Sequence, residues 1–401
     1  MTGADGGERS ATIPWHSRTL YFVLASSLIG VMGVSLISPV LPDLRPVFGV
    51  SDAQIGLVIT AYTLPGIVVT PFIGLVADRI GRRNTLVPLL VLFGVAGAAI
   101  GFVDSFRSVI ALRFLQGIGA SALVTLAITV VGDVYVGPRR TAVIGLNAST
   151  IGTGAALYPL VGGALATIRW SAPFLFFGVG ILVGAIAAVL MEEPGGIENT
   201  SVRTYLARLR AVLFLPEALA IYAAIFVAFT VFYGAVLTAL PLLLSDEFGL
   251  NAGQIGPVLA TTAVASATVS SQYGRISQWR SPAQLVALGF LAYGLSLLGI
   301  WIAPSPVAVG GALLLFGVGF GVVMPSIDTT VITMVSTDLR AGMMGMRTSL
   351  LRLGQTVGPI AFTFLADTLF PDTAVGYRIL ILGSGIAVTL GGGLAYAVLR
   401  R

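Results

Sequence analysis

Long runs of apolar residues, separated by short polar segments, repeat along the whole chain. A helix that crosses a bilayer needs about 20 apolar residues, because each residue advances about 1.5 Å through a hydrocarbon layer about 30 Å thick. On this criterion the pattern predicts twelve transmembrane helices, over residues 19–41, 54–76, 84–103, 108–132, 141–166, 171–191, 213–244, 254–276, 283–303, 306–332, 341–366 and 377–399. The expected fold class is therefore an all-α polytopic membrane protein.

A polar stretch near the middle of the chain divides these helices into two sets of six. Residues 192–212 are predicted to form a cytoplasmic linker between an N-terminal six-helix bundle, residues 19–191, and a C-terminal one, residues 213–401. Residues 1–18 are Gly-rich and polar, and we expect them to form a disordered cytoplasmic tail. No cleavable signal peptide is expected, because the first apolar run is long enough to span and lacks a small-residue cleavage site.

The two halves of the sequence repeat each other at a constant offset of 200 residues. Residues 53–56 return as residues 253–256 with Gln, Ile and Gly in the same places, and Gly117 returns as Gly317. Each half holds an even number of predicted helices, so both halves enter the membrane in the same sense. The sequence therefore predicts two pseudo-symmetric bundles with a binding site between them near the bilayer midplane.

Composition narrows the chemistry that the chain can perform. The sequence is 56% hydrophobic and 10% charged, whereas a soluble protein carries roughly a quarter charged residues. It has no Cys and no Lys, and its single His, His16, lies in the polar tail. These counts exclude disulfides, thiolate metal sites and lysine nucleophiles. With no phosphate-binding loop either, we expect neither an enzyme nor a metal or other cofactor.

The placement of arginines predicts the orientation. Fifteen of the 22 basic residues fall in segments on the side of the N-terminus, and only Arg45, Arg107, Arg169 and Arg378 fall on the other side. Arginine-rich loops stay in the cytoplasm, so both termini are expected there, in a multi-pass protein of the plasma (inner) membrane. The arginines are scattered among loops, which argues against nucleic-acid binding.

The segment between the second and third predicted helices carries the most specific motif. Gly74-Leu-Val-Ala-Asp78-Arg79-Ile-Gly81-Arg82-Arg83-Asn-Thr-Leu86 resembles the signature loop of the major facilitator superfamily, except that Val76 replaces Leu. The resemblance implies that this loop is a conformational latch on the cytoplasmic side, made of Gly74, Asp78, Arg79, Gly81, Arg82, Arg83 and Asp133. Asp78 would lie near the positive end of helix 11, and the arginines would bridge to Asp133 at the inner end of helix 4. A purely positive-inside role would explain the arginines but not Asp78.

Two further motifs resemble the twelve-helix drug:proton antiporters of the same superfamily. Helix 1 ends with Gly33 six residues before Pro39, followed by Pro42. Helix 5 carries a helix-packing motif that recurs in helix 11, although Tyr158 stands where the pattern has Gly; its members are Gly145, Gly154, Pro159, Gly162, Gly163, Gly358 and Pro359. Small residues of this kind let a neighbouring helix approach closely and slide. Gly-Pro pairs are also common in spanning helices generally.

Three charged residues are candidates for proton coupling: Arg113, Asp328 and Asp43. An arginine as deep as Arg113 costs about 2.5–3.5 kcal/mol to insert, so it should face the bundle interior and have a partner. In the resembled family this arginine is associated with proton transfer; the alternative is that it snorkels to the outer interface. Asp328 is the only acid well inside a predicted span. It could couple protons, or pair with Arg352 and hold the C-terminal bundle together.

The predicted substrate cavity lies between the bundles. Its candidate residues are polar or aromatic positions on helices that would face the centre: Tyr62, Gln116, Asn147, Phe229, Tyr233, Met324, Arg352 and Gln355. Most aromatic and Met residues at such spacing are simply core, which is the alternative interpretation.

The resemblance implies a secondary active transporter that works by alternating access. The expected partners are a small-molecule substrate, protons and the lipid bilayer, and the protein is expected to be monomeric. The favoured function is proton-coupled efflux, by antiport, of hydrophobic or amphipathic small molecules. One alternative is a proton symporter or facilitator for a polar metabolite or organic anion, with Arg113, Arg347 and Arg352 binding the charge. The other is a membrane sensor that binds a ligand without moving it.

Overall fold

The computed structural model describes residues 13–193, 216–334 and 337–400. Within these ranges the chain forms helices and no strands. Residues 1–12 of the predicted tail (1–18) and residues 194–212 of the predicted linker (192–212) lie outside the described residues. The helices make twelve passes through the molecule, which confirms the predicted all-α, polytopic class.

The first six passes come from the N-terminal half. In chain order they are α1 (Arg18–Ser35) with η1 (Ser38–Val40) and α2 (Leu41–Phe48); α3 (Asp52–Ile80); α4 (Arg82–Ala99) with η2 (Ile100–Phe102); α5 (Phe106–Ala120) with α6 (Leu123–Val134); α7 (Gly137–Ala166); and α8 (Ala172–Phe176) with α9 (Val179–Leu190).

The last six passes come from the C-terminal half. They are α11 (Pro216–Val231) with the π-helix η3 (Phe232–Ala239) and α12 (Leu240–Phe248); α13 (Ala252–Ser271) with the short α14 (Tyr273–Ile276); α15 (Pro282–Ile302); α16 (Pro306–Met334); α17 (Thr337–Leu369); and α18 (Thr373–Leu399).

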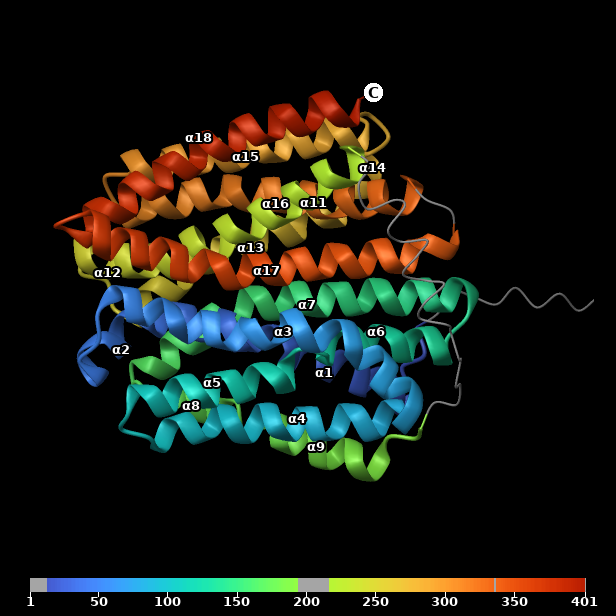
Figure 1. Cartoon of the computed structure of the whole chain (residues 1–401). Helices are drawn as coiled ribbons and strands as arrows, with labels where there is room; N and C mark the ends of the chain where they lie inside the picture. Colours follow the sequence, from blue (N-terminus) through green and yellow to red (C-terminus); the bar gives the residue numbers. More distant parts are fainter. Residues whose placement is uncertain (1–12, 194–215, 335–336, 401) are drawn as a thin grey trace, which may run out of the picture.

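The two halves lie one above the other in Figure 1, with helices of the first half below and those of the second above. Across the boundary α3 packs on α17, and α7 packs on α13. Nine passes of the described chain are long and apolar enough to span a membrane by length and composition alone, and α7, α13 and α17 are not among them. These three helices lie at the boundary between the halves, where each packs on a helix of the other half.

Packing confirms the internal repeat that the sequence predicts. A Cβ added at Gly117 would lie 2.1 Å from the carbonyl oxygen of Tyr62, and one at Gly317 would lie 2.3 Å from that of Thr262. Both pairs are separated from each other by the same 200 residues. Only glycine permits either contact. Helices 2 and 4 of the first half therefore cross in the same close way as helices 8 and 10 of the second half.

The segment that was expected to be a loop between helices 2 and 3 is mostly helical. The helix α3 runs to Ile80, four residues beyond its predicted end, and α4 begins at Arg82. Gly81 alone breaks the two helices, with a φ of 99° that an L side chain rarely adopts. Asp78 and Arg79 therefore occupy the last turn of α3.

Candidate functional site

The two halves are joined at the end of the molecule that holds α2 and α12. Arg45 of α2 lies 2.8 Å from a carboxylate oxygen of Asp52 and donates a second hydrogen bond, of 2.9 Å, to Asp246 of α12. The hydroxyl of Tyr377 donates to the other oxygen of Asp52 at 3.0 Å. These four residues, called here the closing network, link α2 and α3 of one half to α12 and α18 of the other.

Backbone contacts extend this junction toward the middle of the molecule. Thr60 of α3 donates its hydroxyl to the carbonyl of Thr356 of α17 at 3.0 Å. The repeat gives a symmetric pair of crossings, because a Cβ at Gly56 would lie 3.0 Å from the Pro359 carbonyl and one at Gly256 would lie 2.3 Å from the Pro159 carbonyl. The halves are therefore in direct backbone contact over the part of the boundary near α2 and α12.

Toward the opposite end, glycines of the boundary helices have no close neighbour from the other half. A Cβ added at Gly74 of α3, Gly145 of α7 or Gly345 of α17 would meet no atom of the described chain within 4 Å beyond its own helix and adjacent residues. Of the two α3 glycines that contact α17, Gly66 lies nearer this end, and an added Cβ there would lie 3.1 Å from Cδ of Arg352. Between α7 and α13 the contact reaches Gly152, where an added Cβ would lie 3.7 Å from Cβ of Ala267. The boundary thus closes at one end of the molecule and opens at the other.

The charged segment around Gly81 lies at the open end and is held within the N-terminal half. Arg82 forms ion pairs with Asp78 and with Asp133 of α6, the latter at 2.9 Å. Asp78 in the last turn of α3 and Arg82 in the first turn of α4 are four residues apart and pair across the break at Gly81. Arg79 is exposed. The structure thus brings three members of the predicted latch together, and their role as a latch remains a prediction.

A residue that the sequence did not single out completes this cluster. The Glu193 carboxylate accepts hydrogen bonds from the backbone N–H groups of Arg82 and Arg83 at the start of α4. A helix N-terminus presents unpaired N–H groups and partial positive charge, both of which favour a carboxylate. Arg83 also donates to the carbonyl of Ala188 in α9. The end of helix 6 is thereby fixed to the helix 2–3 junction.

Arg113 is fully buried, with none of its surface exposed. Its guanidinium donates to the carbonyl of Val58 at 3.0 Å, to the carbonyl of Gly33 at 2.9 Å and to the side-chain oxygen of Gln116 at 2.8 Å. It also lies 4.5 Å from the centre of the Tyr62 ring, a cation–π distance. The prediction that Arg113 faces the interior is confirmed, and the snorkelling alternative is wrong.

A second arginine cluster, around the partly exposed Arg352, lies on α17 at the boundary between the halves. Arg352 donates to Gln355 at 3.2 Å and reaches the carbonyl of Ser121, in the break between α5 and α6, at 3.5 Å. Gln355 in turn donates to the hydroxyl of Tyr233 at 2.8 Å. Asp328 lies 2.6 Å from Arg347 instead of pairing with Arg352, which corrects the predicted pairing.

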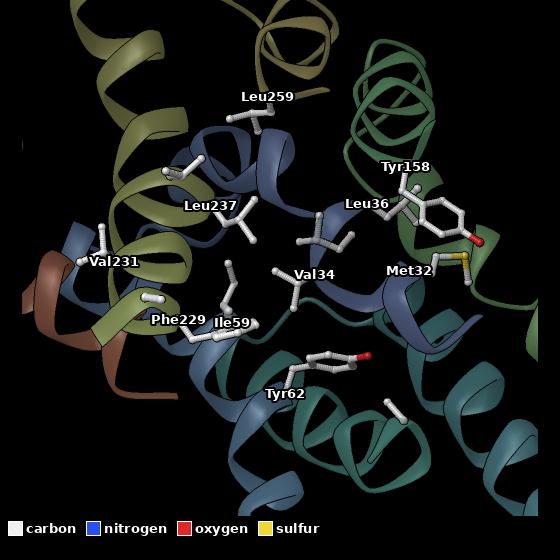
Figure 2. Close-up of a cluster of buried hydrophobic side chains, with 14 of the residues drawn as sticks. Met32, Val34, Leu36, Ile59, Tyr62, Tyr158, Phe229, Val231, Leu237 and Leu259 are labelled. Atoms are coloured by element: carbon white, nitrogen blue, oxygen red, sulfur yellow. The ribbon is translucent and has the colours of Figure 1, made fainter. Parts of the chain in front are cut away.

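The predicted cavity residues therefore fall into two groups. Tyr62 and Gln116 pack around Arg113, whereas Tyr233 and Gln355 accompany Arg352. Phe229 lies 6.0 Å from Tyr233 and 5.7 Å from Phe320, measured between ring centres. Figure 2 shows Val34 and Ile59 of the first half beside Phe229 and Leu237 of the second.

Three further predicted residues lie outside these two groups. Asn147 is buried, and its side-chain oxygen has no hydrogen-bond partner among the described residues. Met324 is partly buried against the core. Asp43 lies at the closed end, where it lines a hollow of about 250 Å³ with Thr167 and Asn251.

The helix-packing motif makes close contacts in both halves. A Cβ at Gly162 would lie 1.9 Å from the Leu36 carbonyl, one at Gly163 would lie 2.4 Å from the Ala252 carbonyl, and one at Gly358 would lie 2.3 Å from the Thr230 carbonyl. Gly154 faces Leu28 and Val31 of α1. Tyr158, which departs from the family pattern, donates its hydroxyl to the Leu28 carbonyl at 3.1 Å. These contacts place helix 5 tightly against helix 1, and helix 11 against helix 7.

A family model of the Major Facilitator Superfamily matches residues 23–359. The chain belongs to this superfamily. The bacillibactin exporter of Bacillus subtilis (strain 168) is 25% identical over 350 residues, which cover 84% of this chain and 87% of the exporter. Multidrug resistance protein 1 of the same organism is 24% identical over 380 residues, covering 93% and 95%.

A crystal structure of a bacterial homolog of the human lysosomal transporter Spinster has the same fold, with a TM-score of 0.78 and 18% identity over 96% of each chain. Because the chain itself belongs to the Major Facilitator Superfamily, it is a multi-pass membrane transporter, and its described residues make the twelve passes given above. Within residues 13–193, 216–334 and 337–400, no group of three or more His, Cys, Asp or Glu side chains is arranged to hold a metal ion.

Two features of this transporter had only indirect signals in its sequence. Arg45 and Asp246 are 201 residues apart, so the repeat places them at equivalent ends of helices 1 and 7 with opposite charge. That signal could have revealed the closing network. Glu193 binds backbone N–H groups, which have no sequence pattern of their own, and only its place at the end of helix 6 hinted at a role.

Proposed function

We propose that the protein exports hydrophobic or amphipathic small molecules by alternating access, in exchange for protons. The observation that carries this proposal is the asymmetric contact between the halves, which meet at the α2–α12 end and separate at the other. We place the protein in the plasma membrane as a monomer, with both termini in the cytoplasm as the arginine distribution indicates. The open end then faces the cytoplasm, which is the state in which an exporter loads its substrate.

The names of two relatives support the direction of transport. One is an exporter and the other a multidrug resistance protein, and each match covers more than four fifths of both chains. A symporter would also pass through a state that is open to the cytoplasm, so the structure alone favours neither direction. Export is proposed on the two observations together.

Proton coupling is assigned to Asp328 and Arg113 in different roles. An arginine keeps its proton, so Arg113 would not carry one; it would hold helices 1, 2 and 4 in one arrangement through its three acceptors. Asp328 is the group that would gain and lose the proton, because protonation removes the attraction to Arg347. One charge moved through 100 mV provides about 2.3 kcal/mol, enough for roughly a fifty-fold substrate gradient.

The proposal is tested with purified protein in liposomes that contain a pH-sensitive dye. A pH gradient is imposed, and lipophilic cations, organic anions and sugars are added one at a time. Export by antiport predicts that a lipophilic or amphipathic compound moves protons in the direction opposite to its own. Proton movement in the same direction as a polar solute would indicate a symporter, and binding without any flux would indicate a sensor.

Asp328→Asn is expected to reduce proton movement per substrate molecule by about tenfold or more, because the asparagine cannot titrate. Substrate exchange down its own gradient should continue. The measurement is proton and substrate flux in the same liposomes. Unchanged proton movement per substrate in this variant would remove Asp328 from the coupling.

Asp78→Asn is expected to slow turnover by about tenfold, the effect of about 1.4 kcal/mol on a barrier, with substrate affinity nearly unchanged. Affinity should change little because Asp78 lies 16 residues, or about 24 Å of helix, from Tyr62 of the Arg113 cluster on the same helix α3. Among the described residues, Asp78 forms an ion pair with Arg82 at the junction of α3 and α4. Initial transport rates are compared with equilibrium binding. The control is Asp104→Asn, an exposed acid in the loop before α5. A large change in affinity at unaltered turnover would contradict the latch.

A further inference from the structure

Two arginines that lie well inside membrane-spanning helices, Arg113 and Arg352, have no acidic partner among the described residues. Arg45, Arg82, Arg347 and Arg378 each form an ion pair with an aspartate or glutamate. Arg113 and Arg352 contact no carboxylate in the part of the chain that the structure describes, and both lie near the boundary between the halves. An unpaired charge inside a membrane protein is costly and marks a functional position.

The two arginines differ in how much of their hydrogen-bonding capacity is used. Arg113 is fully buried and makes three short bonds to fixed acceptors. Arg352 is partly exposed, its two bonds are long, and its Nε has no hydrogen-bond partner in the described residues. Guanidinium has five N–H donors and suits a carboxylate bidentately. Arg352 therefore keeps free N–H donors that can bind an anion, whereas all three nitrogens of Arg113 already donate to acceptors of the protein.

The neighbours of Arg352 supply a second donor. The amide of Gln355 donates to the Tyr233 oxygen, so the hydroxyl proton of Tyr233 is left to donate elsewhere. Tyr233 lies in η3, a π-helix, and π-helical turns inside α-helices occur frequently at functional sites. The guanidinium of Arg352 and the hydroxyl of Tyr233 are thus linked through Gln355 and can both bind the same acidic group.

An apolar surface adjoins these donors. The ring of Phe232 lies 5.7 Å from that of Tyr233 and 4.9 Å from that of Phe320, and Phe229 lies 5.7 Å from Phe320. Phe232, Tyr233 and Phe320 are only partly buried. Arg352 is seven residues, or about 10 Å of helix, from Gly345 at the open end. Arg352 therefore lies within reach of a ligand that enters from that end.

We infer that the exported molecules are amphipathic organic anions, whose acidic group binds Arg352 and Tyr233 and whose apolar body packs on Phe229, Phe232 and Phe320. This inference rests on the proposed export function and names its substrate class. The one acid of α16, Asp328, is already paired with Arg347, so among the described residues this helix offers no free carboxylate to a cationic substrate. An anion would also compete with the Ser121 carbonyl for Arg352 and so release a link between the halves.

The test measures equilibrium binding of three probes that share one apolar body, to the full-length protein in lipid nanodiscs. The probes are naphthalene-2-carboxylate, naphthalene-2-carboxamide and 2-naphthylmethylammonium. The carboxylate is expected to bind about tenfold or more tightly than the amide, and the cation no better than the amide. Arg352→Gln should lower carboxylate affinity to that of the amide and leave amide affinity unchanged. Arg352→Lys should lie between, because it keeps the charge and loses the planar fork.

The matched control is Arg275→Gln, which removes the same charge from an exposed position on α14. It is expected to leave all three affinities unchanged. Unchanged amide binding in Arg352→Gln shows that this variant is folded. If Arg352→Gln also loses amide binding, Tyr233→Phe is used as the test variant instead. It is expected to lose affinity for the carboxylate only. Equal binding of carboxylate and amide, tightest binding of the cation, or insensitivity to the residue at position 352 would overturn the inference.

The outcome separates this inference from the export proposal. Proton-coupled export of neutral or cationic compounds only would leave the export function standing and remove the anion site. Carboxylate binding that depends on Arg352, without transport of any probe in liposomes, would leave the anion site standing and remove export.

Discussion

Arg113→Ala is expected to abolish substrate-dependent proton movement while the protein still inserts into the membrane. The truncation leaves the Val58 carbonyl, the Gly33 carbonyl and the Gln116 side chain without their donor. The Val58 carbonyl keeps its bond within α3, whereas the buried Gln116 oxygen is left unpaired, which costs about 1–3 kcal/mol. Helices 1, 2 and 4 would lose the group that links them, whereas insertion is unaffected because removing an arginine makes helix 4 more apolar.

Arg113→Lys is the matched variant. A lysine keeps the charge, but its compact ammonium cannot span the three acceptors that the planar guanidinium reaches. We expect it to insert normally and to transport little. Proton flux in liposomes is the measurement, with size-exclusion chromatography of the purified variants as the control for folding. Proton-driven transport that persists in Arg113→Ala would remove Arg113 from the mechanism.

Asp246→Asn is expected to change the equilibrium constant between the two states by about tenfold, away from the state joined at the α2–α12 end. The reason is that a charge-assisted hydrogen bond between the halves is weakened by about 1.5 kcal/mol. Asp246 accepts from both terminal nitrogens of Arg45 and lies in the other half. The state seen here requires that contact, and a state open at the α2–α12 end cannot contain it. Labelling of cysteines introduced at the closed end should accelerate correspondingly.

Glu247→Gln is an unusually close control for that prediction. Glu247 is the next residue and loses the same charge, but its ion pair is with Arg378 of α18, within the C-terminal half. It is expected to leave the labelling rate unchanged. Equal acceleration by both variants would mean that general charge, and not the link between the halves, sets the equilibrium.

The sequence predicted the fold because the deciding interactions are repetitive. Apolar runs of membrane-spanning length and a constant offset of 200 residues are visible without any knowledge of contacts. The interior position of Arg113 was also predictable, because burying its charge is costly unless it faces partners. The end of α3 was misjudged, since Asp78 and Arg79 look like loop residues although they complete the last helical turn.

The partners of individual charges could not be predicted in the same way. Arg347 and Arg352 are both on α17, and choosing between them as the partner of Asp328 requires the rotation of α17 against α16. The Glu193 contact is to backbone, and the Ser121 carbonyl becomes available only because helix 4 breaks between α5 and α6. These contacts depend on tertiary geometry, and several of them surround the candidate site.

We propose that this chain alternates between a state joined at the α2–α12 end and a state joined at the opposite end. The chain has no native Cys, so spin labels can be attached to one introduced pair at a time: Val47 and Ser245 at the closed end, or Val76 and Ser349 toward the open end. The measurement is the distance distribution of each pair in lipid, with and without a pH gradient and substrate. Without substrate or a pH gradient, we predict a short distance for the first pair and a long one for the second. When substrate and a pH gradient are both applied, the first distance should lengthen and the second should shorten together. Distances that stay fixed in all conditions, or that change at one end only, would contradict alternating access.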